Sequence, residues 1–288
     1  MNREHARSLH RWFFFVLFWL LLTSVGASHA QEVSPNTTVP PFALYLPAVS
    51  AIVAPDPTPT PTPTPTPACP TTSQRAYDLI PVDGPPADHP DDLHGDLNLG
   101  LRGHSMTRAA LDLIQINGPT DHDAPQLPGL FSDQRTPVFT SAHRVYDWNW
   151  GCGEHGCASQ NLTDVEVSLL GLGASAEETI SIPSRGPEIY GGEYKAMVLY
   201  AAEERITLGY TRHDTVAPGY AVHLESLCVD PNLLALYRQA NAAGRGNLPA
   251  LHNGEVLGTA LDSEVLVAVR DRGTFMDPRS RKDWWRGR

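Results

Sequence analysis

Residues 194–210 read Tyr-Lys-Ala-Met-Val-Leu-Tyr-Ala-Ala-Glu-Glu-Arg-Ile-Thr-Leu-Gly-Tyr, two apolar runs separated by a short polar stretch. Within each run every second residue is apolar or aromatic: Tyr194, Ala196, Val198 and Tyr200, then Ile206, Leu208 and Tyr210. The same alternation recurs at residues 165–169, 180–182, 220–224 and 265–269. A period of two, with glycine, proline or aspartate between the segments, is typical of short antiparallel strands. The sequence therefore predicts a mainly β domain, an antiparallel sandwich or barrel.

One α-helix is predicted to interrupt the strands, at about residues 231–243. Asp230 suits the N-cap because its carboxylate can accept from free backbone amides, and Pro231 suits the first helical position. Gly244 suits the end of the helix. The apolar face would consist of Leu233, Leu234, Leu236 and Tyr237.

The N-terminus has the composition of a secretory signal peptide over residues 1–30. Three arginines precede the apolar run of residues 12–22, and small residues stand at Ser28 and Ala30 before the expected cleavage site. An uncleaved membrane anchor is the alternative, but the run is shorter than the roughly 17 residues that a spanning helix needs. The mature chain is therefore expected to be secreted, with no membrane span.

Residues 31–73 are predicted to be a disordered linker rich in proline and threonine. From Pro57 to Pro67 the two residue types alternate strictly, a pattern that cannot bury a core and that favours an extended polyproline II helix. At about 3.1 Å per residue this stretch would span roughly 34 Å. A short apolar segment around Tyr45-Leu-Pro47 precedes it, for which a surface-retention element and a solitary apolar strand are alternatives. The remaining residues, 74–288, are expected to form one extracellular β-rich domain.

Four cysteines in an exported chain favour disulfides over free thiols or zinc ligands. Cys152 and Cys157 enclose the short loop Cys-Gly-Glu-His-Gly-Cys, which leaves Cys69 to pair with Cys228. The second bond would attach the end of the linker to the β domain. A metal site formed by the two cysteines of the loop and His155 is the alternative, and it would need ligands from elsewhere in the chain.

The charge of the chain excludes some partners. The formal net charge is −11, and removal of the signal peptide leaves 18 basic and 31 acidic side chains. Nucleic acids and anionic lipids are bound by clustered positive charge, so neither is expected as a partner. The one basic stretch runs from Arg270 to Arg288 around Trp284 and Trp285. It is predicted to be a solvated C-terminal end, with contact to an anionic wall polymer as the alternative.

Several short segments follow one another in a recognisable order between residues 186 and 278. They are Val198-Leu-Tyr-Ala-Ala202 before a turn, Gly219-Tyr220 at the start of a strand, Leu236-Tyr237 in the helix, the turn Asn253-Gly-Glu-Val-Leu-Gly258 and the closing pair Asp277-Pro278. In this order they resemble the β-rich core of the lysostaphin-type (LytM-like) zinc endopeptidases, which cut bacterial wall peptides. With the Tyr-Leu-Pro segment and the linker, the resemblance implies a protein of the bacterial cell envelope.

The zinc ligands of that family are missing from the corresponding positions. Such enzymes take their ligands from a His-x-x-x-Asp motif and a His-x-His motif, with a further histidine just after the leucine-tyrosine pair. Gln239 stands at the position of that histidine, and Glu264-Val-Leu266 at the position of His-x-His. His143-Arg-Val-Tyr-Asp147 has the spacing of the first motif, but it lies well before the resembling segment and is predicted to be a strand. The resemblance therefore implies a degenerate, non-catalytic member.

The densest group of potential metal ligands lies between Asp88 and Asp96. His94 and Asp96, with His104 a little further on, are the candidate ligands, for zinc through imidazole and carboxylate groups or for calcium through carboxylate oxygens. The spacing matches neither an EF-hand loop nor a zincin helix. A solvated acidic loop is favoured over a metal site, so no cofactor is expected.

Aromatic residues gather just before the short cysteine loop. Tyr146, Trp148 and Trp150 alternate along a predicted strand. Flat aromatic rings beside a rigid turn are suited to hold sugar rings or peptide planes. Alternate residues of a strand lie on one face, so the pattern favours a different role, in which all three side chains pack in the core. His223, which alternates with apolar neighbours, is predicted to be a hydrogen-bonded core histidine.

These patterns favour a surface-displayed β domain that binds cell-wall or extracellular polymer without cutting it. The first alternative is a zinc-dependent hydrolase of wall peptides with an unconventional site drawn from His89, His94, Asp96, His104, or His143 with Asp147. The second is an adhesion domain stabilised by calcium at residues 88–96.

Overall fold

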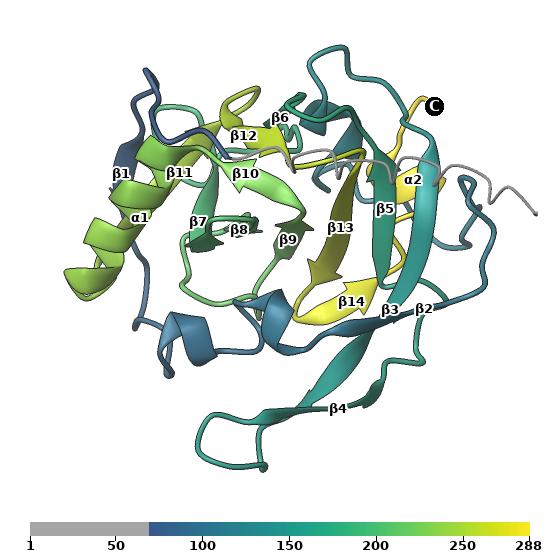
Figure 1. The fold of residues 1–288 in the computed structure, drawn as a ribbon, viewed down its shortest axis with the longest axis horizontal. Coiled ribbons are helices and arrows are strands. Elements are labelled where there is room, and N and C mark those ends of the chain that lie inside the picture. Colours follow the sequence, from purple (N-terminus) through teal and green to yellow (C-terminus); the bar gives the residue numbers. More distant parts are fainter. Residues whose placement is uncertain (1–68) are drawn as a thin grey trace, which may run out of the picture. The chain divides into compact units, whose positions relative to one another are not determined.

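The hairpin predicted for residues 194–210 is present in the computed structural model, which describes residues 69–288 (Figure 1). Its strands are β7 (Tyr194–Ala202) and β8 (Arg205–Gly209), and they pair antiparallel. Glu203 and Glu204 form the turn between them. The alternation of residues 194–210 therefore predicts both the type and the order of these elements.

The remaining elements are short. The other strands are β1 (Asp78–Pro81), β2 (His104–Met106), β3 (Phe139–Asn149), β4 (Cys157–Asn161), β5 (Leu169–Gly173), β6 (Thr179–Ser181), β9 (Tyr220–Glu225), β10 (Leu227–Val229), β11 (Asn247–His252), β12 (Val256–Ala260), β13 (Glu264–Asp271) and β14 (Thr274–Met276). The helical elements are the single turns η1 (Asp91–Leu93), η2 (Leu99–Leu101) and η3 (Leu127–Leu130), with the α-helices α1 (Pro231–Ala242) and α2 (Arg281–Trp284).

The strands form two antiparallel sheets. The main path of the large sheet runs β1-β11-β7-β8-β9-β13-β5-β3-β2, with β14 added to β13 and β4 added to β3. The small sheet has the order β10-β12-β6 and lies along the upper side of the domain in Figure 1. The prediction of a mainly β, antiparallel domain is confirmed.

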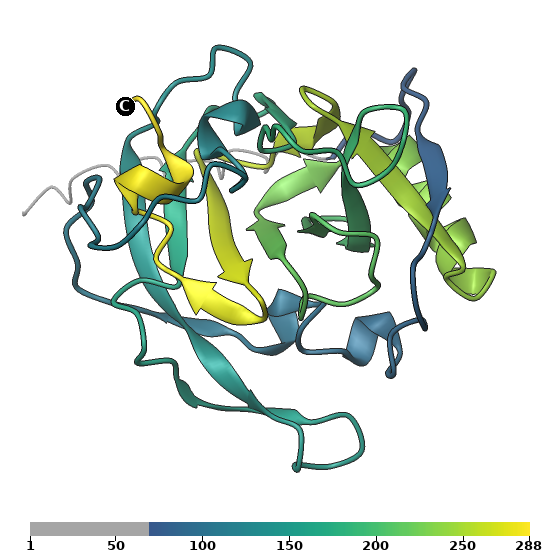
Figure 2. The ribbon, with the colours of Figure 1, turned by 180° about the vertical axis from the view of Figure 1, so that it is seen from behind.

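The main core lies on one face of the large sheet. Leu208, Val222 and Val269 are neighbours in register across β8, β9 and β13, and all three are fully buried. They belong to one cluster with side chains of the small sheet and of α1, among them Ile180, Leu233 and Leu257. Helix α1 packs beside β11 and β7, as Figures 1 and 2 both show. Burial of this face is the main source of stability.

Helix α1 forms where the sequence predicts it. The carboxylate of Asp230 accepts from the backbone amides of Asn232 and Leu233, and Pro231 occupies the first turn. Gly244, just beyond the helix, has a φ of +91°, a conformation that favours glycine.

Both predicted disulfides are present. Cys69 pairs with Cys228 in β10, and Cys152 pairs with Cys157 at the start of β4. The residues that follow Cys69 also contact the domain, since Ser73 Oγ donates to Asp230 Oδ2 at 2.7 Å. The end of the predicted linker is therefore fixed to the β domain.

The C-terminal segment is not a solvated tail, so that prediction is wrong. Trp284 is 1% exposed and Trp285 is fully buried, and their indole N–H groups donate to the carbonyls of Asp277 and Pro278. Arg279 is fully buried as well, and its guanidinium pairs with Asp277 Oδ2 at 2.7 Å. The two indoles bury a large apolar area, which outweighs the cost of burying a paired arginine.

Strand β3 extends beyond the sheet. Its first half pairs with β5, whereas its second half pairs with β4 to form a two-stranded ribbon. In Figure 1 this ribbon projects from the lower side of the domain, with the loop closed by Cys152 and Cys157 at its tip. The second half of β3 carries the aromatic residues that the sequence singles out.

The predicted signal peptide, the Tyr-Leu-Pro segment and the Pro-Thr run lie outside the described residues. Residues 69–288 contain no helix that is both long enough and apolar enough to cross a membrane.

Candidate functional site

Polar side chains occupy the second face of the large sheet, opposite the main core. Thr207 in β8 and His223 in β9 are register neighbours on this face, and Arg270 in β13 lies close by. The segment from Asp91 to Gly103 covers them, because Thr207 Oγ1 donates to the carbonyl of Leu97 at 2.6 Å. His223 is 1% exposed and its Nδ1 lies 2.9 Å from Thr207 Oγ1. The prediction of a hydrogen-bonded core histidine is confirmed.

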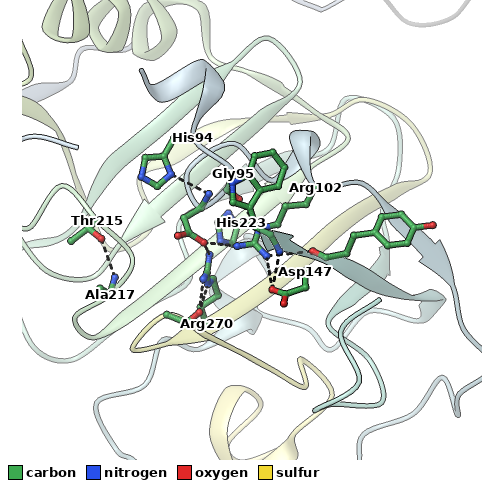
Figure 3. Close-up of polar contacts among 12 residues, drawn as sticks. His94, Gly95, Arg102, Asp147, Thr215, Ala217, His223 and Arg270 are labelled. Atoms are coloured by element: carbon green, nitrogen blue, oxygen red, sulfur yellow. Dashed lines mark hydrogen bonds and ion pairs between the residues drawn. The ribbon is translucent and has the colours of Figure 1, made fainter. Parts of the chain in front are cut away.

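Asp96 binds two buried arginines on this face (Figure 3). Its Oδ1 atom accepts from Arg102 Nη2 at 2.5 Å and from Arg270 Nη1 at 2.8 Å. Burial by itself would raise the pKa of the Asp96 carboxyl, but the guanidiniums of Arg270 and Arg102 hold it below its ordinary value. We call these three residues the cation cluster. Asp96 is therefore charged, and it offsets buried positive charge.

The cation cluster also holds the far half of β3 in place. Arg102 Nε donates to the carbonyl of Gly95 at 2.6 Å, and Arg102 Nη1 donates to the carbonyl of Tyr146 at 3.3 Å. The indole of Trp148 packs directly on Gly95, where any side chain would collide with the ring. The ribbon is thus tied to the segment that covers the sheet.

Next to these contacts, four rings from two segments form an aromatic group, of which only Trp150 is exposed. Trp150 stacks on His89 with ring centroids 5.0 Å apart and an interplanar angle of 11°. His94 meets the same indole edge-on at 4.9 Å, and Trp148 does so at 6.1 Å. We call His89, His94, Trp148 and Trp150 the aromatic platform. Trp150 is 40% exposed, so part of its side chain remains accessible to solvent.

The disulfide loop lies against the platform. Gly156 fits against the indole of Trp148, and the ring of His155 lies 5.7 Å from that of His89. The bond between Cys152 and Cys157 closes this loop. The loop is therefore a rigid support for the two tryptophans.

The three aromatic residues predicted for binding are not equivalent. Trp148 and Trp150 belong to the platform, whereas Tyr146 is half-buried and its ring lies over Gly103. The alternative, that all three pack in the core, is wrong, because the end of β3 leaves the sheet before Trp150. The sequence does not predict that His89 belongs to an aromatic site, because His89 is distant in sequence from Trp150.

The candidate metal ligands do not converge. His94 Nδ1 accepts from the Asp96 amide at 3.1 Å, while the Asp96 carboxylate binds arginines. His104 lies against His143 instead, with ring centroids 4.6 Å apart. Within residues 69–288 no group of three or more histidine, cysteine, aspartate or glutamate side chains is placed to hold a metal ion.

The positions that would carry zinc in the resembling family lie on helix α1 and strand β13. Gln239 is exposed on α1, and Leu266 belongs to a small apolar cluster on the second face of the sheet. Glu264 accepts from Ser141 Oγ at 2.7 Å, and Ser141 in turn lies 2.9 Å from His143 Nε2. This polar chain across β13 and β3 is not apparent from the sequence.

Comparison of the chain with protein-family models, with curated proteins and with solved structures found no match. The function must therefore be argued from the site itself.

The buried histidines predict a loss of stability in mild acid. Burial lowers the pKa of His94, His143 and, most strongly, His223. The histidines of the unfolded chain take up protons near pH 6.5. In the folded protein these three histidines take up protons only at a lower pH. The free energy of unfolding is therefore expected to be highest above pH 6.5 and to fall as the pH drops below it.

Urea denaturation at about pH 7.5 and pH 5.0 measures this effect. Replacing His223 with leucine should reduce the difference in stability between the two conditions, because it removes the most buried imidazole. Equal stability of the unchanged protein at both pH values would show that folding does not lower the pKa of these histidines.

Proposed function

We propose that this chain is an exported, non-catalytic binding module that holds a cell-wall or other extracellular polymer on its aromatic platform. One observation carries the proposal. Trp150 is 40% exposed, although its indole stacks on His89 at 5.0 Å and meets His94 in a T-shaped contact at 4.9 Å. An exposed tryptophan that ring contacts hold in one orientation is suited to meet a partner, because the indole combines a large apolar surface with a polar N–H group and is enriched at interfaces.

The platform is suited to flat or ring-shaped ligands. Indole faces bind sugar rings and peptide planes through a large contact area, and a preformed surface avoids the entropic cost of ordering side chains on binding. The cation cluster fixes β3, and the disulfide loop fixes the other side of Trp148. The partner would therefore meet a surface that needs little rearrangement.

The display of the module follows from the linker. The disulfide between Cys69 and Cys228 attaches the last residue before Pro70 to β10. The Pro-Thr run lies outside the described residues; a spacer of that composition before this bond would set the domain at a distance from a cell surface. Such an arrangement favours binding over free diffusion.

Removal of the Trp150 side chain is expected to weaken polymer binding about tenfold or more, because aromatic residues at the centre of a contact contribute most of the affinity. Sedimentation of the protein with insoluble wall material measures binding of the Trp150→Ala variant. Met106→Ala is the matched control, since Met106 is an exposed apolar residue of β2 at 79% exposure and is not part of the platform.

Two outcomes would contradict the proposal. Equal binding by Trp150→Ala and by the unchanged protein would exclude the platform. Release of soluble fragments from the wall material by purified protein would show that the module is an enzyme.

A further inference from the structure

A cavity of about 210 Å³ opens beside the cation cluster. The residues that line it include Arg102, Arg270, Thr274, Phe275 and Asp147. None of the residues that line this cavity belongs to the aromatic platform.

The two arginines are more deeply buried than their charge would normally allow. Their side chains are 4% and 6% exposed, and the one carboxylate oxygen that both contact is Oδ1 of Asp96. Arg102 has a second carboxylate at 3.8 Å, that of Asp147, but this side chain is 55% exposed. Burial lowers the pKa of both guanidiniums in spite of these carboxylates. Of the carboxylates near the two guanidiniums, only that of Asp96 is largely buried with them.

Some N–H groups of the two guanidiniums make no hydrogen bond to the described residues. Each arginine carries five N–H donors. Arg102 donates to Gly95, Tyr146 and Asp96, and Arg270 donates to the carbonyl of Gly273 through Nε and Nη2 and to Asp96 through Nη1. Among the described residues, two N–H groups of each guanidinium thus have no recorded acceptor. The Phe275 ring fixes both planes, with guanidinium carbons 5.4 Å and 4.6 Å from its centroid.

We propose that this cavity is a binding site for a small carboxylate, either a free acid or the carboxyl end of a larger molecule. The guanidinium fork matches the two oxygens of a carboxylate, and buried charge-assisted hydrogen bonds are the strong ones. The volume corresponds to about seven waters at the liquid share of about 30 Å³ each, which suits a carboxylate with a few carbons.

The same walls select against more highly charged anions. Asp147 and Asp164 both line the cavity, so a phosphate or sulfate dianion meets two negative charges there. With Asp96, three carboxylates surround two guanidiniums, so the net charge repels a dianion about twice as strongly as a monoanion. The site is therefore expected to prefer carboxylates to phosphate. This proposal is independent of the aromatic platform.

Titration of the full chain with sodium acetate tests it, at constant ionic strength and about pH 7. We expect saturable shifts of the Thr274 and Phe275 amide resonances, and weaker binding of inorganic phosphate. N-acetylalanine should bind as acetate does if the site takes the end of a larger molecule, and more weakly if it takes only free acids.

Asp147→Asn should tighten acetate binding about fivefold, because it removes a negative charge that lines the cavity. The Asp147 side chain is 55% exposed, so the variant is expected to fold.

Thr274→Trp should fill the cavity and abolish acetate binding, whereas Trp150→Ala should leave it unchanged. The proposal is overturned if acetate gives no saturable response up to about 100 mM, if phosphate binds more tightly, or if Thr274→Trp folds and still binds. Where Thr274→Trp does not fold, an unchanged affinity of Asp147→Asn overturns it instead. Loss of acetate binding in Trp150→Ala would place the ligand on the platform.

Discussion

Replacing both Cys69 and Cys228 with serine is expected to lower the free energy of unfolding by about 5 kcal/mol. The bond joins residues separated by 159 positions, and cross-linking so long a loop removes many conformations from the unfolded chain. In the chain-entropy model the stabilisation grows with the logarithm of loop length, which gives this value. Such a loss is a large part of the stability of a typical domain.

Urea denaturation of the double variant measures the loss, and the short disulfide is a matched control. Cys152 and Cys157 are separated by only 5 positions, so their replacement should cost about 2 kcal/mol. The m-value should also rise for the Cys69/Cys228 variant, because its unfolded chain is less compact. Similar losses for the two pairs would mean that local contacts, such as Ser73 with Asp230, determine the contribution of the long bond.

Those parts of the fold that depend on local chemistry are predictable from the sequence. The alternation in β7 and β8, the Asp230 cap of α1 and the pairing of four cysteines each follow from neighbouring residues or from elimination. The tail is different. Trp284 and Trp285 look like part of a solvated basic end, because nothing nearby in sequence shows that a pocket in the core receives them.

The site is predictable only in part, for the same reason. Trp148 and Trp150 stand out as aromatics beside a closed loop, but their partner His89 comes from a distant segment. Likewise, Asp96 and Arg270 are 174 residues apart and meet only because β13 lies beneath the segment that covers the sheet. The carboxylate of Asp96 suggests a metal ligand when read in sequence, and the arginines that bind it give it a different role.

Replacing Asp96 with alanine is expected to destabilise the protein by about 3–5 kcal/mol, since it leaves two buried guanidiniums without their shared carboxylate. Thermal or urea unfolding at about pH 7 measures the loss. Asp147→Asn is the control, because its carboxylate is 55% exposed and lies 3.8 Å from Arg102, so the change should cost less than about 1 kcal/mol.

A double variant separates lost charge pairing from lost packing. If uncompensated charge is the cause, adding Arg102→Met to Asp96→Ala should recover part of the stability, because one buried guanidinium is then gone. No recovery would indicate that the Asp96 contacts matter mainly through the backbone near His94.

The pH dependence gives a further check. The pKa of Asp96 is lowered, so its contribution to stability is complete above about pH 4 and is lost only as the pH falls through the folded-state pKa. Asp96→Ala should nevertheless cost somewhat more at pH 5 than at pH 7.5, because the Asp96 charge raises the pKa of His94 and His223 and its loss lowers both further. The cation cluster would then be a fixed structural anchor for β3, and any acid response of the domain would come from its imidazoles.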